Sequence, residues 1–258
     1  MEMLSKAREK EIRKLYTRKG RNESGLCICE GLRACRELYK FLKKSIKYAV
    51  TSNSDFLGMF DGITFFLIEN ERMSKLTSTV TPQGLLFIAE IPPLTKPIYE
   101  KIPFAIFLDK IADPGNLGTI LRTALSAGLR DVWISNGSVD PFSEKTIRAG
   151  LASQFYIHIH YFDKIEAGIL ELKKNGFNAV YCTEPSHGKN CFEVEELFNK
   201  SIIVFGNEAN GLDKIENSYF LNIPMPGGFE SLNLAQSVTI VVYDAVRRNI
   251  FGENFNKN

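Results

Sequence analysis

The 258-residue chain is 44% hydrophobic and 24% charged, carries a net charge of +2 and has the composition of a globular protein. No apolar run reaches the roughly 20 residues of a membrane-spanning helix, and the segment MEMLSKAREKEIRKLY is charged where a secretory signal is apolar, so we expect a cytoplasmic protein without a membrane partner. The five cysteines and three histidines form no zinc-ligand spacing, so we expect buried, reduced thiols and no metal.

The first 91 residues alternate between short apolar runs and amphipathic stretches. The pattern predicts a basic N-terminal helix within residues 1–20 and then a small α/β domain over residues 21–91. The elements expected in chain order are a helix at 4–19, a strand at 26–29, a helix at 31–44, a strand at 46–52, a short helix at 54–60, an apolar run at 63–69 and a strand at 81–91.

Positive charge is concentrated at the start of the chain. Residues 1–47 hold 14 Lys and Arg against 6 Asp and Glu, whereas the remainder holds 18 against 24. Such asymmetry favours a polyanionic partner for the basic part. A solvated helix face explains the charge equally well, and composition alone leaves both interpretations open.

A proline-rich segment follows at residues 92–103, PPLTKPIYEKIP. Proline fixes φ and lacks an amide donor, so the four prolines exclude a continuous helix or a central strand. We expect a linker here, with a second domain over residues 104–258.

The second domain alternates more regularly between apolar strands and helices. Strands are expected at 104–109, 131–135, 155–159, 178–184, 201–206 and 220–226, and helices at 116–128, 142–152, 163–176, 193–200 and 231–251. Strands of this kind, separated by helices, predict an α/β fold with a parallel sheet covered on both faces. Ligands bind such sheets at the carboxyl ends of the strands, so the loops there are the candidates for chemistry.

The first candidate loop is DPGNLGTILRTA, residues 113–124. A Pro-Gly turn leaves the strand, Asn116 is a candidate N-cap, and Arg122 can point back toward the strand ends. The alternative is an ordinary capped helix with a surface arginine. Because no GxGxxG pattern is present, a nicotinamide dinucleotide site is not supported.

The second loop is VFGNEANGL, residues 204–212, in which an apolar strand runs directly into Gly206. Glycine permits positive φ and close approach of a ligand to the backbone. Glu208 could pair with Arg122, accept hydrogen bonds from a ligand, or be a solvated loop acid.

The third loop is IPMPGGFESLNLAQS, residues 223–237. Its prolines and glycines predict an irregular loop, after which Ser231 is expected to open a helix with Leu232 and Asn233 in the first turn. Ser231 can be a simple N-cap. A rigid loop with a Met and a Leu at its rims would also serve as one wall of an adenine slot.

These three segments, in this order and spacing, resemble the motifs of the SpoU (TrmH) family of RNA ribose methyltransferases, within the SPOUT superfamily. The resemblance covers residues 104–248. CICEGLRACRELY and TPQGLLFIAE are similar, more loosely, to the opening and closing strand of a small RNA-binding domain that many members carry. The resemblance implies a SPOUT domain with a trefoil knot, S-adenosylmethionine as cofactor, and a homodimer.

The resemblance also implies roles for individual residues. The polar catalytic set is Asn116, Arg122, Glu208, Ser231 and Asn233, and the cofactor-binding set is Gly206, Ile223, Leu232, Met225 and Thr183. The family proposal makes the arginine of the first motif, here Arg122, the activator of the ribose hydroxyl. Guanidinium stays protonated in proteins, so stabilising the developing alkoxide is the more defensible role.

The implied reaction is methyl transfer from S-adenosylmethionine to a ribose 2′-hydroxyl of RNA. An additional N-terminal domain and basic leader favour ribosomal RNA of the large subunit. Transfer RNA as substrate, a catalytically inactive RNA-binding relative and a base methyltransferase are the alternatives.

Overall fold

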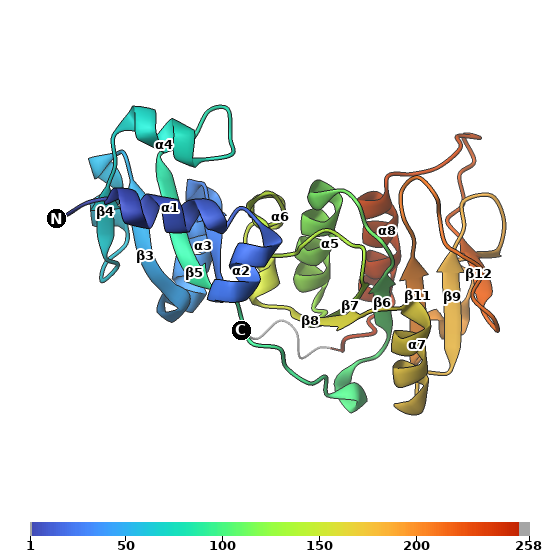
Figure 1. Cartoon of the computed structure of the whole chain (residues 1–258). Helices are drawn as coiled ribbons and strands as arrows, with labels where there is room; N and C mark the ends of the chain where they lie inside the picture. Colours follow the sequence, from blue (N-terminus) through green and yellow to red (C-terminus); the bar gives the residue numbers. More distant parts are fainter. Residues whose placement is uncertain (1, 253–258) are drawn as a thin grey trace. The chain divides into compact units, whose positions relative to one another are not determined.

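The chain forms two compact units, residues 1–93 with 140–155 and residues 94–139 with 156–258. The computed structural model describes residues 2–252, and Figure 1 labels their helices and strands.

The first unit is built on a five-stranded mixed sheet in the order β1-β4-β3-β5-β2. Strand β5 runs antiparallel to β2 and β3, whereas β4 is parallel to β3. The strands are β1 Glu2–Met3, β2 Leu26–Glu30, β3 Ile46–Thr51, β4 Phe65–Leu67 and β5 Leu85–Glu90. The helices of this unit are α1 Lys6–Lys14, α2 Arg18–Ser24, α3 Leu32–Leu42, α4 Asn70–Leu76 and α6 Glu144–Gly150, with 3₁₀ turns at Lys43–Ser45, Ser54–Met59 and Ser153–Phe155.

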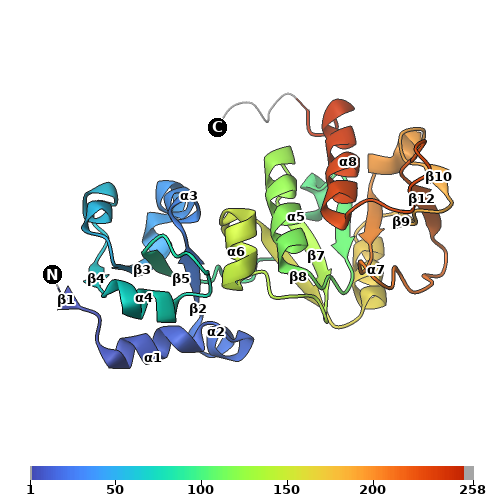
Figure 2. The same ribbon diagram turned by 90° about the horizontal axis from the view of Figure 1, so that it is seen from above.

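Two helical layers enclose this sheet. Helices α1 and α4 cover one face and α3 covers the other (Figure 2). Ile12 of α1 and Met73 of α4 are buried against Ile28, Val50 and other apolar side chains of the strands. Burial of this apolar surface is the main stabilising term of the unit.

The predicted helix at 4–19 is interrupted in the structure. Thr17 adopts an extended conformation, and its hydroxyl accepts a hydrogen bond from the Gly20 amide, so a second helix begins there. Since Leu4, Ile12 and Leu15 are buried in the core of the first unit, the basic leader packs as part of that unit rather than beside it. Helix α4 was not predicted from the sequence.

Residues 140–155 belong to the first unit, although the sequence prediction assigned them to residues 104–258. A buried ion pair helps to hold the segment there: Arg21 Nη2 lies 2.6 Å from Asp140 Oδ2. The same guanidinium donates from Nη1 to the Leu15 carbonyl at 2.7 Å. With its hydrogen bonds satisfied, the buried arginine ties residues 140–155 to helix α2.

The second unit contains a seven-stranded sheet in the order β10-β12-β9-β11-β6-β7-β8, and neighbouring strands among the described residues are parallel throughout. This confirms the predicted α/β fold with a parallel sheet. The strands are β6 Ala105–Leu108, β7 Asp131–Ser135, β8 His158–Phe162, β9 Ala179–Thr183, β10 Lys189–Asn190, β11 Ser201–Phe205 and β12 Tyr219–Asn222. The trefoil knot stays a prediction.

Helices cover both faces of the second sheet (Figure 2). Helices α5 Pro114–Ala127 and α8 Leu234–Arg247 pack together on one face, and α7 Ile165–Lys174 lies on the other. Gly168 of α7 allows this close packing, because a Cβ there would lie 2.3 Å from the Phe107 ring. Short 3₁₀ turns occur at Tyr99–Lys101, within the predicted linker, and at Glu195–Phe198, where a helix over 193–200 was expected.

All five cysteines are buried and free, as expected. No helix in the described part of the chain is long and apolar enough to span a membrane.

Candidate active site

Four adjacent strands of the second sheet end at the same edge. Strands β12, β9, β11 and β6 are neighbours, with Leu221 opposite Thr183, Val204 opposite Cys182, and Phe205 opposite Leu108. The strands are parallel, so their carboxyl ends meet there. The three motif segments follow β6, β11 and β12 and are therefore brought together.

Helix α5 in the first motif is capped by Asp113, not by Asn116 as the sequence suggested. Asp113 Oδ1 accepts a hydrogen bond from the Asn116 amide at 2.7 Å, and Pro114 occupies the first helical position. Proline fits there because its fixed φ is helical and the missing donor is not needed. The Asn116 side chain is therefore free of capping and available to neighbouring loops.

The second motif is fastened to the loop after β6. Asn207 Nδ2 donates to the Lys110 carbonyl at 2.8 Å, while its Oδ1 accepts from the amides of Ala209 and Asn210. Glu208 accepts from the backbone amides of Ala112 at 3.2 Å and Asp113 at 3.4 Å. These contacts set the position of the Glu208 carboxylate.

Gly206 lies directly after β11 and approaches its own chain. A Cβ at this position would stand 2.6 Å from Leu212 Cγ and 2.7 Å from the Gly211 carbonyl carbon and oxygen. The left-handed φ of this loop, +67°, belongs to Gly211 instead. Glycine at 206 is thus required by the tight closure of the second motif onto itself.

Helix α8 in the third motif begins at Leu234 and is capped by Asn233, which corrects the expectation that Ser231 opens the helix. Asn233 Oδ1 accepts from the Ala235 amide at 2.9 Å and the Gln236 amide at 3.4 Å. A side-chain oxygen in this position satisfies amides that have no partner within the helix. Ser231 and Leu232 lie in the preceding irregular segment, and both are exposed.

One chain of hydrogen bonds connects all three motifs. Asn233 Nδ2 donates to Asn116 Oδ1 at 3.0 Å, and Asn116 Nδ2 donates to Glu208 Oε1 at 2.9 Å. An ionised Glu208 only accepts hydrogen bonds, so Asn116 must turn its NH2 group toward Glu208 and its oxygen toward Asn233. The orientation of both asparagine amide groups follows from this.

The carboxylate at the end of this chain is held in its charged form. Partial burial acts to raise the pKa of Glu208, but hydrogen bonds from Asn116 and from backbone amides outweigh it, so the pKa lies below its ordinary value. Glu208 is accordingly an acceptor at neutral pH.

Arg122 is exposed on α5 and forms no hydrogen bond or ion pair with any residue that the structure describes. The pairing with Glu208 that the sequence left open is therefore absent between these two described side chains: Glu208 accepts from Asn116 and the backbone. A guanidinium without an internal ion pair can take an anionic ligand without first breaking one.

The remaining candidate residues lie at neighbouring strand ends. Thr183 closes β9, and its hydroxyl donates to the Val204 carbonyl at 3.0 Å. Ile223 follows β12 directly, and the Met225 carbonyl accepts from the Gly228 amide at 3.0 Å in a tight turn. Ile223 and Met225 are half-buried and Leu232 is 37% exposed, so the loop offers apolar surface at its rim.

Asp113 and Asn207 were missed as contributors to this site. Asp113 precedes a proline, and Asn207 follows a glycine in a loop. Asp and Asn in such turns often bond to the nearby backbone, as Asp113 does with the Asn116 amide and Asn207 with the amides of Ala209 and Asn210. Neither pattern could reveal that Asp113 frees the Asn116 side chain from capping, or that Asn207 joins the second motif to the loop after β6.

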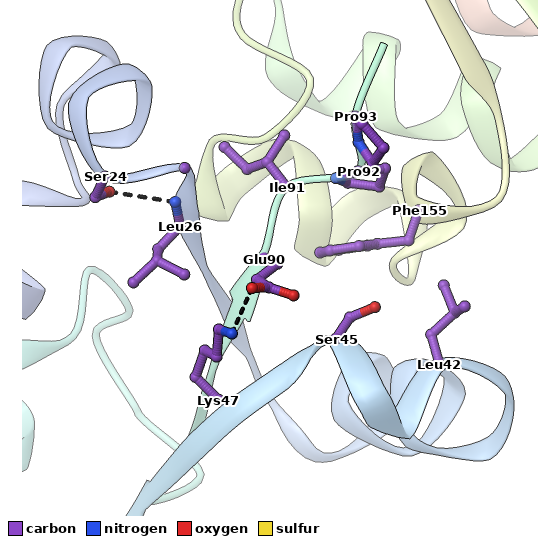
Figure 3. A pocket seen from close by; sticks show the side chains of 11 residues that line it. Ser24, Leu26, Leu42, Ser45, Lys47, Glu90, Ile91, Pro92, Pro93 and Phe155 are labelled. Carbon is purple, nitrogen blue, oxygen red and sulfur yellow. Dashed lines mark hydrogen bonds and ion pairs between the residues drawn. The ribbon is translucent and has the colours of Figure 1, made fainter. Parts of the chain in front are cut away.

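A cavity of about 630 Å³ lies elsewhere, in the first unit (Figure 3). Its ionised groups, Lys47 and Glu90, form an ion pair with each other, and none of the motif residues lines it. The cavity therefore offers no unpaired charge to a substrate, and the strand edge of the second unit is the better candidate for chemistry.

Comparison with known families finds two matching models. The SpoU rRNA Methylase family matches residues 103–243, and the MRM3-like substrate binding domain matches residues 6–86.

Individual relatives agree with these matches. The 23S rRNA (guanosine(2553)-2′-O)-methyltransferase RlmP of Bacillus subtilis is 31% identical over 241 residues, covering 91% of this chain and 94% of that protein. The structure resembles an RNA methyltransferase of the TrmH family from Porphyromonas gingivalis, with a TM-score of 0.81 and 27% identity, covering 95% of this chain and 99% of that one. An AdoMet-bound rRNA methyltransferase from Sinorhizobium meliloti gives a TM-score of 0.78 and 28% identity, covering 96% and 97%.

Proposed function

Because the chain belongs to the SpoU rRNA methylase family, we propose that it methylates a ribose 2′-hydroxyl of large-subunit ribosomal RNA. It is an enzyme that uses S-adenosylmethionine, and RNA is its substrate class. The identity of the RNA, the roles of single residues and the oligomeric state are part of the proposal.

The observation that carries the proposal is the hydrogen-bond chain from Asn233 through Asn116 to Glu208. Its members come from three separate segments, and their side chains meet at the edge where parallel sheets bind ligands. A preorganised polar set of this kind needs no rearrangement when charge develops on a substrate.

The loops at this edge fit S-adenosylmethionine. Gly211, Gly227 and Gly228 have open space where a Cβ would lie, so a ligand can approach their backbone directly. Met225 and Leu232 supply apolar surface for an adenine, beside Thr183, Gly206 and Ile223 at the strand ends. When bound, the cofactor supplies an electrophilic sulfonium methyl group.

We propose that Arg122 binds and orients the ribose whose 2′-oxygen attacks the methyl group. Its guanidinium can donate to the 2′-oxygen and to a neighbouring phosphate, which orients the ribose and stabilises the alkoxide as its proton passes to solvent water. Glu208, ionised at neutral pH, holds Asn116, and Asn116 with Asn233 presents a fixed polar wall. Ser231 lies exposed before α8 and could contact the ribose or the cofactor.

Two observations favour ribosomal RNA. The first unit matches a substrate-binding domain over residues 6–86, and a relative that spans nearly the whole chain carries 23S rRNA in its name. We also propose a homodimer, as the family resemblance implies. The cytoplasmic location expected from the sequence stays a prediction.

The test is methyl transfer from methyl-labelled S-adenosylmethionine to deproteinised large-subunit rRNA and, separately, to total transfer RNA. Label in alkali-resistant dinucleotides of the ribosomal RNA supports the proposal. Label confined to transfer RNA would replace the substrate, label in free bases would identify a base methyltransferase, and no label with intact RNA binding would identify an inactive relative.

A further inference from the structure

The positive charge of the first unit is divided between helices on opposite faces of its sheet. Helix α1 lies on one face and α3 on the other (Figure 2). Residues 31–45, which contain α3 and the following turn, hold five Arg and Lys and one acidic residue, Glu37. The charge pattern found in the sequence therefore has two separate structural sources.

The basic residues of α3 and of the first position after it form a single stripe. Arg33, Arg36, Lys40 and Lys43 are spaced by three, four and three residues, and all four are exposed. Ala34, Cys35 and Leu38 occupy the opposite, buried side of the helix. With a rise of about 1.5 Å per residue, this α3 stripe is roughly 15 Å long, enough to run beside several phosphates of a nucleic acid strand.

The contacts of the stripe are with soft groups. Arg36 Nη2 lies 3.8 Å from Met59 Sδ, the Lys40 ammonium 4.7 Å from the Phe41 ring centroid, and the Lys43 ammonium 5.6 Å from the Tyr39 ring centroid. Among the described residues, none of the four stripe side chains forms an ion pair with a carboxylate. The Tyr39 ring and half-exposed Met59 flank these charged groups.

Helix α1 differs because its arginines are already used. Arg13 pairs with Glu9 at 2.9 Å and donates to the Lys75 carbonyl, and Arg8 lies 3.9 Å from the Phe66 ring centroid. Glu9 also accepts from Arg72. Hydrogen bonds from Arg13, the larger cause, and from Arg72 lower the pKa of Glu9. The α1 face thus keeps exposed lysines and one guanidinium, that of Arg8, which is covered by the Phe66 ring rather than paired with a carboxylate.

We propose that the α3 stripe is the surface on which the first unit docks the RNA backbone, a proposal that rests on the proposed function of the chain. A guanidinium group can donate two parallel hydrogen bonds to phosphate oxygens. A neighbouring aromatic ring such as that of Tyr39 offers a surface on which an unstacked base can pack. The α3 stripe lies on the face of the sheet opposite to α1 and offers two arginines, two lysines and a flanking aromatic ring to one RNA strand.

The experiment uses the full-length protein and deproteinised large-subunit rRNA as the probe. Arg33→Gln/Arg36→Gln/Lys40→Gln removes three charges from the stripe. Lys6→Gln/Lys10→Gln/Lys14→Gln removes three exposed charges from α1 and is the matched control. Dissociation constants are measured between 50 and 200 mM KCl, together with S-adenosylmethionine affinity and melting temperature.

We expect the stripe variant to lose affinity on the order of 100-fold near 0.1 M KCl, and its salt slope to fall by roughly 2 to 3, since each phosphate contact contributes about 0.7–0.9. The control should keep most of both. Arg33→Lys/Arg36→Lys retains the charges and should keep the salt slope. Cofactor affinity and melting temperature should be unchanged in all variants.

Equal effects of the two triple variants, or an unchanged slope in the stripe variant, would overturn the assignment of RNA docking to α3. These outcomes leave the proposed function intact if the wild-type protein methylates the RNA. Conversely, wild-type protein that binds RNA through the stripe without transferring methyl groups would refute the activity and not the surface.

Discussion

The Asn233 side chain joins two tasks through its contact with Asn116. Its oxygen caps α8, while its nitrogen donates to Asn116 Oδ1 at 3.0 Å. The start of one helix is therefore set by the same residue that orients a polar group on another. Because the oxygen caps the helix and the nitrogen contacts Asn116, a substitution that keeps only the oxygen can separate the stability of α8 from the geometry of the candidate site.

Asn233→Asp should keep the cap and lose the site. A carboxylate still accepts from the Ala235 amide, but it cannot donate to Asn116 and it adds negative charge near Glu208. We expect methyl transfer to fall at least tenfold with a change in unfolding free energy within about 1 kcal/mol. Thermal unfolding and single-turnover methyl transfer measure the two effects.

The matched variant is Asn233→Ala, which removes both functions and should cost about 1 kcal/mol through the lost cap. If Asn233→Asp transfers methyl groups at the wild-type rate, Asn233 acts only as a helix cap.

Arg122→Ala should abolish methylation while largely sparing cofactor binding. Removing one donor to a developing oxyanion costs about 10²–10³ in turnover. Because Arg122 is exposed and has no partner among the described residues, stability should change by less than about 0.5 kcal/mol. Turnover is measured with saturating RNA, and cofactor affinity by calorimetry.

Arg122→Lys is the control for charge. It keeps one positive charge without the planar fork and should recover only part of the activity. Near-normal turnover by Arg122→Ala would remove this residue from the proposed mechanism.

Gly206→Ala should weaken cofactor binding by opening the second motif. The added Cβ would meet the Gly211 backbone at 2.7 Å, which cannot yield as a flexible side chain could. Gly58→Ala in the first unit is the control, because its Cβ would meet nothing within 4 Å and it lies outside the three motifs. We expect a lower melting temperature and lower cofactor affinity for Gly206→Ala alone, measured by calorimetry; equal stability of the two variants would contradict the tight closure.

Ionised Glu208 should contribute to stability above its ordinary pKa of 4.5, and this contribution should be lost as pH falls through its lowered value in the folded protein. Acidification below pH 4.5 should therefore destabilise the wild-type protein more than Glu208→Gln. The comparison uses denaturant unfolding between pH 3 and 7. A constant stability difference over that range would show that the hydrogen bonds do not favour the ionised form.

Lys200→Met should destabilise the second unit. The Lys200 ammonium donates to the carbonyls of Tyr99 at 2.6 Å, Glu100 at 3.3 Å and Ile102 at 2.8 Å. A hydrogen bond to a charged group contributes at most about 1.5–3 kcal/mol to stability. The three bonds of Lys200 contribute less than that each, because the side chain is partly exposed to solvent. We expect a melting temperature lower by several degrees. Since Lys200 has φ +49°, Lys200→Gly separates backbone relief from lost hydrogen bonds.

The sequence determined most of the local structure of this protein. Apolar runs such as residues 201–205 become buried parallel strands, and Gly128 ends α5 in the left-handed conformation that glycine favours. The three motifs also identified the family without the fold, because their order and spacing survive in the linear chain. The spacing of apolar residues and the local composition are properties of short stretches of chain, so they can be read directly from a single sequence.

Tertiary structure decided which side chain serves which purpose. Asp113 and Asn233 cap the helices for which Asn116 and Ser231 were expected, because capping depends on backbone angles and on competing partners in other loops. Likewise, the ion pair between Arg21 and Asp140 helps to hold residues 140–155 in the first unit across a long stretch of chain. Contacts of this kind depend on distance in space, which spacing along the chain does not encode.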